Sequence, residues 1–221
     1  MATIISFANQ KGGVGKTTLC TTFANFLVEK GERLLVLDCD SQQSISEKRK
    51  VDEHKYPNTQ FGYNVQSFNI GAADNVSKLM HHLKEKEGII LIDTPGHLSQ
   101  QGLLPIFVNS DFIVCPYQYE ATSISSTITF LKFFKELKVR VSNMVTDLLL
   151  VVNCYDKRFG KKAELELWKQ TDKAFSNYGK LLPPIAIKAD MKRYNTVSLM
   201  DGQLDTIRDC YNQLFDCIKS K

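Results

Sequence analysis

The sequence contains no apolar run that approaches the ~20 residues of a membrane-spanning helix. We expect no secretory leader, since the chain opens with Met1 and passes directly into a strand-like segment at Thr3. Internal repeats, low-complexity tracts and an obvious interdomain linker are also missing. We therefore expect one globular domain over residues 1–221, cytoplasmic and without a membrane partner.

Paired cysteines are missing too. The six cysteines stand at positions 20, 39, 115, 154, 210 and 217, and none forms a Cys-x-x-Cys motif. Most lie in apolar segments, which favours buried free thiols in a reduced cytosol over disulfides or metal ligands.

A large excess of one charge is missing overall, because the formal net charge is only +4. The excess is concentrated between Tyr155 and Arg193, where ten basic and five acidic residues give a local charge of +5. The rest of the chain is close to neutral. A local basic surface indicates a polyanionic partner, and a solvated lysine-rich face is the alternative interpretation.

Nearly continuous Val, Ile and Leu runs alternate with helical patterns. We expect strands over residues 3–8, 33–38, 65–69, 88–93, 111–116, 147–153 and 181–187. We expect helices over residues 17–30, 75–86, 99–108, 123–138 and 161–176, and a short helix and a loop within residues 44–63. Strands with little alternation are typical of sheets covered on both faces. The pattern predicts an α/β fold, a mostly parallel twisted sheet with helices on both faces.

The last segment, residues 203–219, places apolar side chains at helical spacing. Such an amphipathic helix usually closes a hydrophobic core. A membrane-targeting helix is the alternative, but its polar face would be richly basic, and here the charges are mixed. We expect this helix to pack on the sheet.

A glycine-rich segment follows the first expected strand and precedes the first expected helix. It consists of Lys11, Gly12, Gly13, Val14, Gly15, Lys16, Thr17 and Thr18. The standard phosphate-loop motif begins with glycine, and Asn9 stands at that position here. Glycines let backbone N–H groups approach phosphate oxygens, and the following helix N-terminus adds a positive dipole end. We expect Lys16 to reach the β- and γ-phosphates of ATP and the Thr17 hydroxyl to bind Mg²⁺.

Polar residues end several of the expected strands. Asp38, Asp40 and Asp93 follow two of them, where a buried carboxylate is costly unless it meets a cation or hydrogen-bond donors. The carboxyl ends of parallel strands share one edge, so these residues should lie beside Mg²⁺-ATP. Asn153 ends another strand, and its amide offers adenine both a donor and an acceptor. A simple turn residue is the alternative there.

The segment from Lys11 to Thr18 resembles the deviant Walker A box of the ParA/MinD family of ATPases, in which the first lysine is the signature. Residues 34–42 resemble the family's second box, with Ser41 in place of the usual proline. Residues 89–96 resemble Walker B followed by switch II. The resemblance covers nearly the whole chain. It is nearest to the small ParA proteins of plasmids and mobile elements, which lack an N-terminal DNA-binding extension.

The resemblance implies an ATP-sandwich homodimer in which Lys11 reaches the phosphates of the partner protomer. It implies that Asp93 and Asp38 support magnesium together with Thr17, and that Asp40 orients or activates the attacking water. The implied catalytic residues are therefore Lys11, Lys16 and Asp40. Gly96 would give switch II the freedom to respond to the γ-phosphate.

The resemblance also implies contacts outside the phosphate site. Asn153 and Pro184 would lie near the adenine, and Lys188, Lys192 and Arg193 would meet non-specific DNA through its phosphates. These features imply a slow, partner-stimulated ATPase that partitions plasmid or chromosomal DNA. Its partner would be a ParB-like centromere-binding protein, and its location the nucleoid.

Other members of the same family are alternatives. A conjugation-associated ParA relative of a mobile element and a MinD-like positioning ATPase or nucleotide switch share the same motifs. A cluster carrier would need cysteines that bridge two protomers, and Cys115 is the only loose candidate. We therefore expect no iron–sulfur cluster.

Overall fold

The computed structural model describes all 221 residues and forms one seven-stranded sheet. The strands are β1 (Thr3–Phe7), β2 (Leu34–Asp38), β3 (Asn64–Ser67), β4 (Ile89–Asp93), β5 (Phe112–Tyr117), β6 (Asp147–Val152) and β7 (Lys180–Leu181). Their order across the sheet is β3-β2-β4-β1-β5-β6-β7, and all neighbours pair in parallel.

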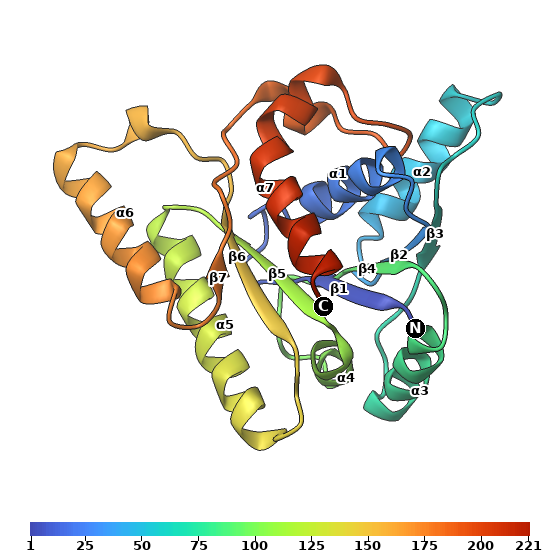
Figure 1. Cartoon of the computed structure of the whole chain (residues 1–221), viewed down its shortest axis with the longest axis horizontal. Coiled ribbons are helices and arrows are strands. Elements are labelled where there is room, and N and C mark those ends of the chain that lie inside the picture. The colour runs from blue at the N-terminus through green and yellow to red at the C-terminus, as the bar shows by residue number, and fades with distance from the viewer.

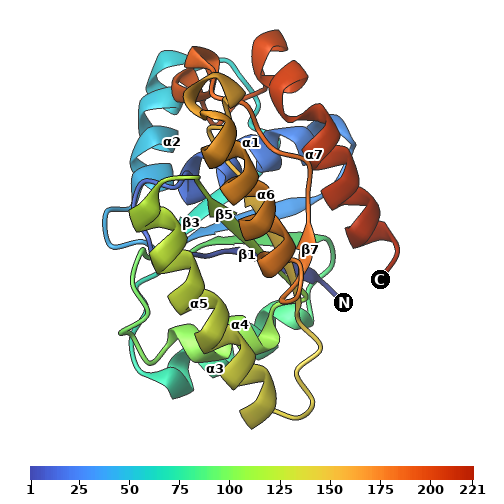
Figure 2. The same cartoon turned by 90° about the vertical axis from the view of Figure 1, so that its left-hand side faces the viewer.

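Helices cover both faces of the sheet (Figures 1 and 2). They are α1 (Lys16–Glu29), α2 (Ser44–Lys55), α3 (Ala73–Lys84), α4 (Leu103–Asn109), α5 (Ala121–Arg140), α6 (Lys162–Phe175) and α7 (Asp201–Lys219). Two 3₁₀ turns, η1 (Lys157–Phe159) and η2 (Ala189–Arg193), lie in the last third of the chain. Helices α1, α2 and α7 lie on one face, and α3, α4 and α5 on the other. The predicted α/β fold is confirmed.

The central strands β4, β5 and β6 are almost wholly apolar because both of their faces are buried. In β4, Ile90 and Ile92 join the core under α3, α4 and α5, whereas Ile89 and Leu91 join the core under α1 and α7. The two cores are of equal size, with 25 buried residues each. This explains why the sequence shows little alternation of apolar and polar residues in its strands.

Two expected elements differ from the structure. The helix expected from residue 99 begins only at Leu103, so the chain between β4 and α4 is a longer loop. The last strand, expected over residues 181–187, is regular only at Lys180 and Leu181, although Leu182 and Ile185 still donate to carbonyls of β6 and Ala186 forms an isolated bridge with Tyr155. Pro183 and Pro184 follow, and proline has no N–H for a sheet ladder. The other expected helices are present with ends shifted by a few residues, and the helix and loop expected within residues 44–63 correspond to α2 and the chain before β3.

The predicted role of the last helix is confirmed, because α7 closes the core against α1. The Tyr211 hydroxyl donates to the Leu19 carbonyl over 3.0 Å and lies 2.7 Å from the Thr22 hydroxyl. The ring of Tyr211 meets that of Phe23 edge-on at 5.0 Å between centroids. No helix in the structure has the length and apolar character that crossing a bilayer would require.

The six cysteines are free thiols, as expected, and most of them are buried. Burial raises the pKa of Cys20, Cys39, Cys115 and Cys210, in the last case to about 12. A thiol with a raised pKa is a poor nucleophile, so these four are packing residues. Cys154 is exposed.

We expect Tyr211→Phe to lower the free energy of unfolding by about 0.5–1.5 kcal/mol, because it removes two buried hydrogen-bond contacts and keeps the ring. Tyr211→Ala should cost about 3–5 kcal/mol, because it also leaves a cavity. Urea unfolding followed by circular dichroism measures both. Tyr178→Phe is the control, since the structure gives its hydroxyl no hydrogen bond, and equal losses for Tyr178→Phe and Tyr211→Phe would contradict the assignment.

Candidate nucleotide-binding site

The phosphate loop lies between β1 and α1, at the carboxyl edge of the sheet. Two of its glycines have positive φ angles, +80° at Gly13 and +100° at Gly15. A Cβ at Gly15 would collide with the side-chain amide of Asn153. The loop therefore needs glycine at position 15 for both its backbone conformation and its contact with the end of β6.

Asn9 anchors the start of this loop, at the position where the standard motif has glycine. Its amide donates to the Pro116 carbonyl over 2.8 Å and to the Thr127 hydroxyl over 2.9 Å, and its side-chain oxygen accepts from the Lys11 N–H over 3.3 Å. The side chain is buried. Asn9 thus ties the loop to β5 and α5, a role that glycine could not perform.

Lys16 lies inside the loop, where it is only 6% exposed. Its Nζ donates to the Lys11 carbonyl over 3.3 Å. Burial lowers the pKa of the Lys16 ammonium, and the charge of Asp93 partly opposes that shift. An anion placed in the loop would restore the partners that burial takes from this ammonium.

Asp38 and Asp93 lie side by side, because β2 and β4 are neighbours and the two residues are in register. The Thr17 hydroxyl donates to Asp93 Oδ2 over 2.7 Å, and the Ser46 N–H donates to Asp38 Oδ2 over 2.9 Å. The second oxygen of each carboxylate is buried without a hydrogen-bond partner. Burial raises the pKa of both carboxyls, and that of Asp93 to about 7.

These residues fit a magnesium ion. Carboxylate and hydroxyl oxygens are the ligands that Mg²⁺ takes from proteins, and it binds through one or two carboxylates together with substrate phosphates. Asp38 and Asp93 each keep one buried oxygen without a hydrogen-bond partner, and the other oxygen of Asp93 accepts from the Thr17 hydroxyl. A divalent cation here would offset the cost of two buried neighbouring carboxylates.

A cavity of about 450 Å³ opens above the loop. Pro95 is the one apolar side chain in its wall, which consists of Gly12, Gly13, Gly15, Lys16, Thr17, Thr18, Asp40, Ser41, Gln42, Pro95, Gly96 and His97. Asp40 Oδ1 accepts from the Gln42 N–H over 3.0 Å, which leaves its other oxygen available to the cavity. Pro95 and His97, which flank Gly96, line the cavity but were not among the predicted site residues.

Switch II touches the phosphate loop directly. A Cβ at Gly96 would lie 3.3 Å from the Gly12 nitrogen and 3.5 Å from Lys16 Nζ. A larger residue would therefore press on the loop and on its lysine. This contact gives a physical reason for glycine at position 96.

Four residues predicted for ATP binding, Lys11, Val14, Asn153 and Pro184, lie outside the cavity wall. Lys11 is partly exposed beside it, and Val14 is buried beneath the loop. The Asn153 amide donates to the Val14 carbonyl over 2.8 Å, so Asn153 supports the loop from below with one of its donors. Its adenine contact stays a prediction.

Pro184 lies apart from the phosphate cavity. It lines a separate cavity of about 360 Å³ together with Tyr117, Tyr155 and Trp168. The structure therefore does not bring Pro184 to the residues that would hold the phosphates.

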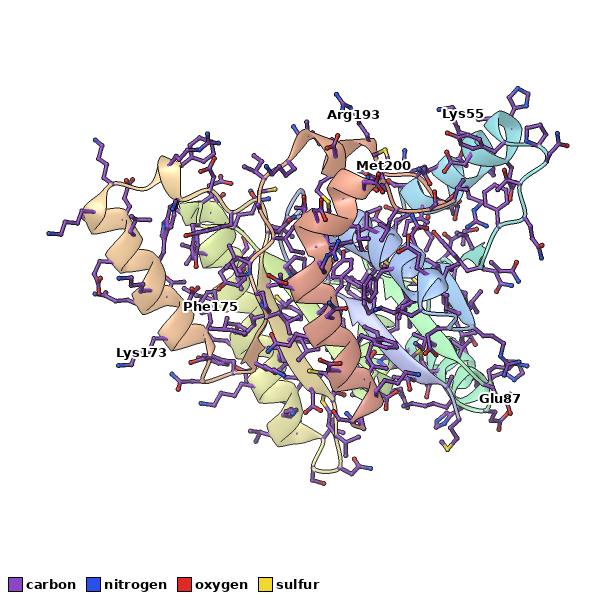
Figure 3. All side chains as sticks on the ribbon, turned by 45° about the horizontal axis from the view of Figure 1, so that its top comes forward. Lys55, Glu87, Lys173, Phe175, Arg193 and Met200 are labelled. Carbon is purple, nitrogen blue, oxygen red and sulfur yellow. The ribbon has the colours of Figure 1, made fainter.

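The expectation of one basic surface between Tyr155 and Arg193 is wrong. The window divides between α6, which projects from one end of the sheet, and η2, which lies beside α7 (Figure 1). Lys173 and Arg193 lie far apart in Figure 3. Counting charge along the chain joined two surfaces that folding separates. Lys188, Lys192 and Arg193 remain together and exposed at η2.

Comparison with known proteins gives a match over most of the chain. A model of the CobQ/CobB/MinD/ParA nucleotide binding domain matches residues 5–183. The chromosome-partitioning ATPase Soj of Thermus thermophilus is 27% identical over 179 residues, which cover 70% of each chain.

Solved structures show the same fold. A putative plasmid partition protein of Borrelia burgdorferi bound to AMPPNP matches with a TM-score of 0.71, at 20% identity and over 100% of both chains. A MinC:MinD cell division complex of Aquifex aeolicus matches with a TM-score of 0.71, at 14% identity, over 97% of this chain and 96% of that one.

We expect Asp93→Asn to stabilise the metal-free protein increasingly as pH rises. The pKa of Asp93 is raised from 3.8 to about 7 in the folded state, so the folded protein holds a proton that the unfolded chain has lost. Wild-type stability should therefore fall between pH 4 and pH 7, and asparagine removes that fall. Melting temperatures measured in EDTA from pH 5 to pH 8 test this, with Asp209→Asn on α7 as an exposed control. A pH-independent difference between wild type and Asp93→Asn would contradict the raised pKa.

Proposed function

The chain belongs to the CobQ/CobB/MinD/ParA nucleotide-binding family, and from that premise we propose that it is a ParA-type ATPase that partitions DNA. In this proposal it binds Mg²⁺-ATP, dimerises around two nucleotides, and holds non-specific DNA in the ATP-bound form. Slow hydrolysis, stimulated by a ParB-like centromere-binding partner, then releases the DNA. Its place in the cell is the nucleoid.

The observation that carries the ATPase proposal is the pair formed by Thr17 and Asp93 beside Lys16. A hydroxyl, a buried carboxylate with one free oxygen and a buried ammonium meet at the N-terminus of a helix. Lys16 and the loop N–H groups would hold the β- and γ-phosphates. Thr17, Asp38 and Asp93 would hold Mg²⁺, which supplies charge neutralisation at the phosphates when bound. No adenine contact is needed for this part of the proposal.

The proposed role of Asp40 is to orient or activate the attacking water. It lines the cavity opposite switch II, and one of its oxygens is engaged by Gln42 while the other faces no protein donor. A carboxylate at this position can accept a proton or orient a water molecule for in-line attack. Asp38 is fully buried and bonded to α2, so its proposed role is metal support.

Lys11 supports the dimer proposal by its position. It is adjacent to the phosphate loop but does not line the cavity of its own protomer. A cation at this rim is available to phosphates that a second protomer brings against the carboxyl edge of the sheet. The same arrangement would place two η2 turns, with Lys188, Lys192 and Arg193, on one dimer.

The cargo proposal rests on the exposed cations of η2 and on the relatives named as partition proteins. A MinD-like positioning role is the second candidate, supported by the shared fold. Against it, Ile207, Tyr211 and Leu214 of α7 are buried in the core, so this helix has no apolar face left for a membrane. A conjugation-associated relative would use the same chemistry, and turnover stimulated by a centromere-binding protein favours partition.

We expect Lys11→Ala to weaken ATP-dependent dimerisation at least tenfold while ATP affinity of the monomer changes little, since Lys11 lies outside its own cavity. Asp40→Ala is the matched comparison and should bind ATP and dimerise but release phosphate far more slowly. Sedimentation with ATP, calorimetric titration and a phosphate-release assay separate these effects. Wild-type dimerisation by Lys11→Ala would show that Lys11 does not act across the interface.

We expect the double variant Lys192→Glu with Arg193→Glu to lose duplex DNA binding in ATP about equally for all sequences. Phosphate contacts carry no base readout, and each contributes roughly −0.9 to the log–log slope of affinity against salt. The double variant should therefore also show a shallower slope, and ATP binding and dimerisation should be retained. Fluorescence anisotropy with labelled duplexes measures this, and an unchanged affinity and slope would exclude η2 as the DNA surface.

A further inference from the structure

The segment that follows η2, from Tyr194 to Ser198, is hydrogen-bonded to both helices that begin beside the nucleotide site. Helix α1 begins at Lys16 in the phosphate loop, and α2 begins at Ser44, beyond the loop that carries Asp40. The Asn25 amide of α1 donates to the carbonyls of Asn195 over 2.9 Å and Ser198 over 3.0 Å.

Helix α2 contacts the same segment through a buried arginine. Arg49 is 7% exposed and has no carboxylate within 4.0 Å. Its guanidinium donates to the Thr196 hydroxyl over 3.0 Å, to the Thr196 carbonyl over 3.1 Å and to the Tyr63 carbonyl over 2.7 Å. It also lies 4.4 Å from the centre of the Phe61 ring. A buried guanidinium with these partners holds Thr196 from one side.

A buried carboxylate one turn along α2 holds the same threonine from the other side. Asp52 Oδ2 accepts from the Thr196 N–H over 2.7 Å and from its hydroxyl over 2.8 Å. Arg49, Asp52 and Thr196 therefore form one buried network, which we call the Thr196 clamp. The Thr196 hydroxyl is the centre of the clamp, since it donates to Asp52 and accepts from Arg49.

A lysine of α2 also lies against the residue that follows η2. Lys48 Nζ lies 4.7 Å from the centre of the Tyr194 ring, next to Arg193 in the chain. Burial raises the pKa of the Tyr194 hydroxyl, and a hydrogen bond with the Thr18 side chain partly opposes that shift. Thr18 lines the phosphate cavity. Tyr194 therefore lies between Thr18 of the phosphate loop and Lys48 of α2, and it directly follows Arg193 of η2.

Two of the cations on this surface have no carboxylate partner. Lys50 pairs with Glu47 and Arg193 with Asp190, both on exposed surface. Lys48 and Lys192 have no carboxylate within 4.0 Å. Figure 3 shows Arg193 and Lys55, at the end of α2, on the same side of the molecule, away from Lys173.

We propose that Lys48 belongs to one phosphate-binding surface with Lys192 and Arg193, and that the Thr196 clamp holds α2 and η2 together to form it. The partner is the backbone of duplex DNA, so this inference rests on the proposed function. Lys48 contacts DNA phosphate directly, whereas Arg49, Asp52 and Thr196 are positioning residues. The surface is therefore assembled from two segments about 150 residues apart in the chain.

The first test compares two lysines of the same helix. Lys48→Gln should weaken ATP-dependent duplex binding about three- to tenfold near 0.15 M salt and reduce the salt slope by roughly 0.9 for each protomer that contacts DNA. Lys50→Gln is the matched control, because it removes the same charge from the same helix at a residue that pairs with Glu47 and does not meet the Tyr194 ring, and it should bind like the wild type. Anisotropy titrations between about 50 and 200 mM salt give both quantities.

The second test removes one hydroxyl from the clamp. Thr196→Val keeps the shape of the side chain but breaks its bonds with Arg49 and Asp52, and it should weaken DNA binding about as much as Lys48→Gln. Thr196→Ser restores the hydroxyl and should restore DNA binding. ATP affinity, measured by calorimetry on protein shown to be folded by circular dichroism, should be the same in all three, which a general loss of structure would not permit.

The outcomes separate the inference from the function beneath it. If wild-type protein with ATP does not bind duplex DNA, the proposed function is wrong and this surface with it. If wild type binds and the Lys192→Glu, Arg193→Glu variant does not, but Lys48→Gln matches Lys50→Gln, then the inference fails and the proposed function stands. If Thr196→Val does not fold, the two lysine variants alone decide whether Lys48 belongs to the surface.

Discussion

The site depends on two neighbouring carboxylates that are buried at the carboxyl edge of the sheet. Asp38 and Asp93 are in register on adjacent strands, and burial raises the pKa of both. Their positions follow from the strand order, which inserts β4 between β1 and β2. Lys16 and Thr17 then approach from the next loop across. The arrangement leaves buried oxygens without donors, and a cation with phosphate is the chemistry that would complete it.

The sequence allowed the sheet and the phosphate loop to be predicted, because both depend on local pattern. Strands covered on both faces are continuously apolar, and a glycine-rich loop between strand and helix has few other uses. The anchoring by Asn9 and the support by Asn153 needed the structure, since each joins residues more than a hundred positions apart. The expectation of one basic surface was wrong for a related reason, because charge counted along the chain does not say which surface a side chain reaches.

The nucleotide site and the basic turn are joined by rigid elements. Helices α1 and α2 both start beside the phosphate cavity, and both bond to the segment after η2. Buried side chains in such contacts have few alternative arrangements, so a change at one end of a helix is carried to the other end as a shift of the whole element. The end of β6 also supports the phosphate loop, because the Asn153 amide donates to the Val14 carbonyl.

The two outer strands have a consequence for how this chain meets copies of itself. At one border, β3 is four residues long and exposes Asn64, Gln66 and Ser67. At the other, β7 is a regular strand over only two residues, and Pro183 and Pro184 interrupt it before the chain pairs again at Ala186. Short, polar and proline-interrupted borders offer a poor template for a further strand. Neither edge strand therefore favours edge-to-edge pairing of sheets into fibres, even at high local protein concentration.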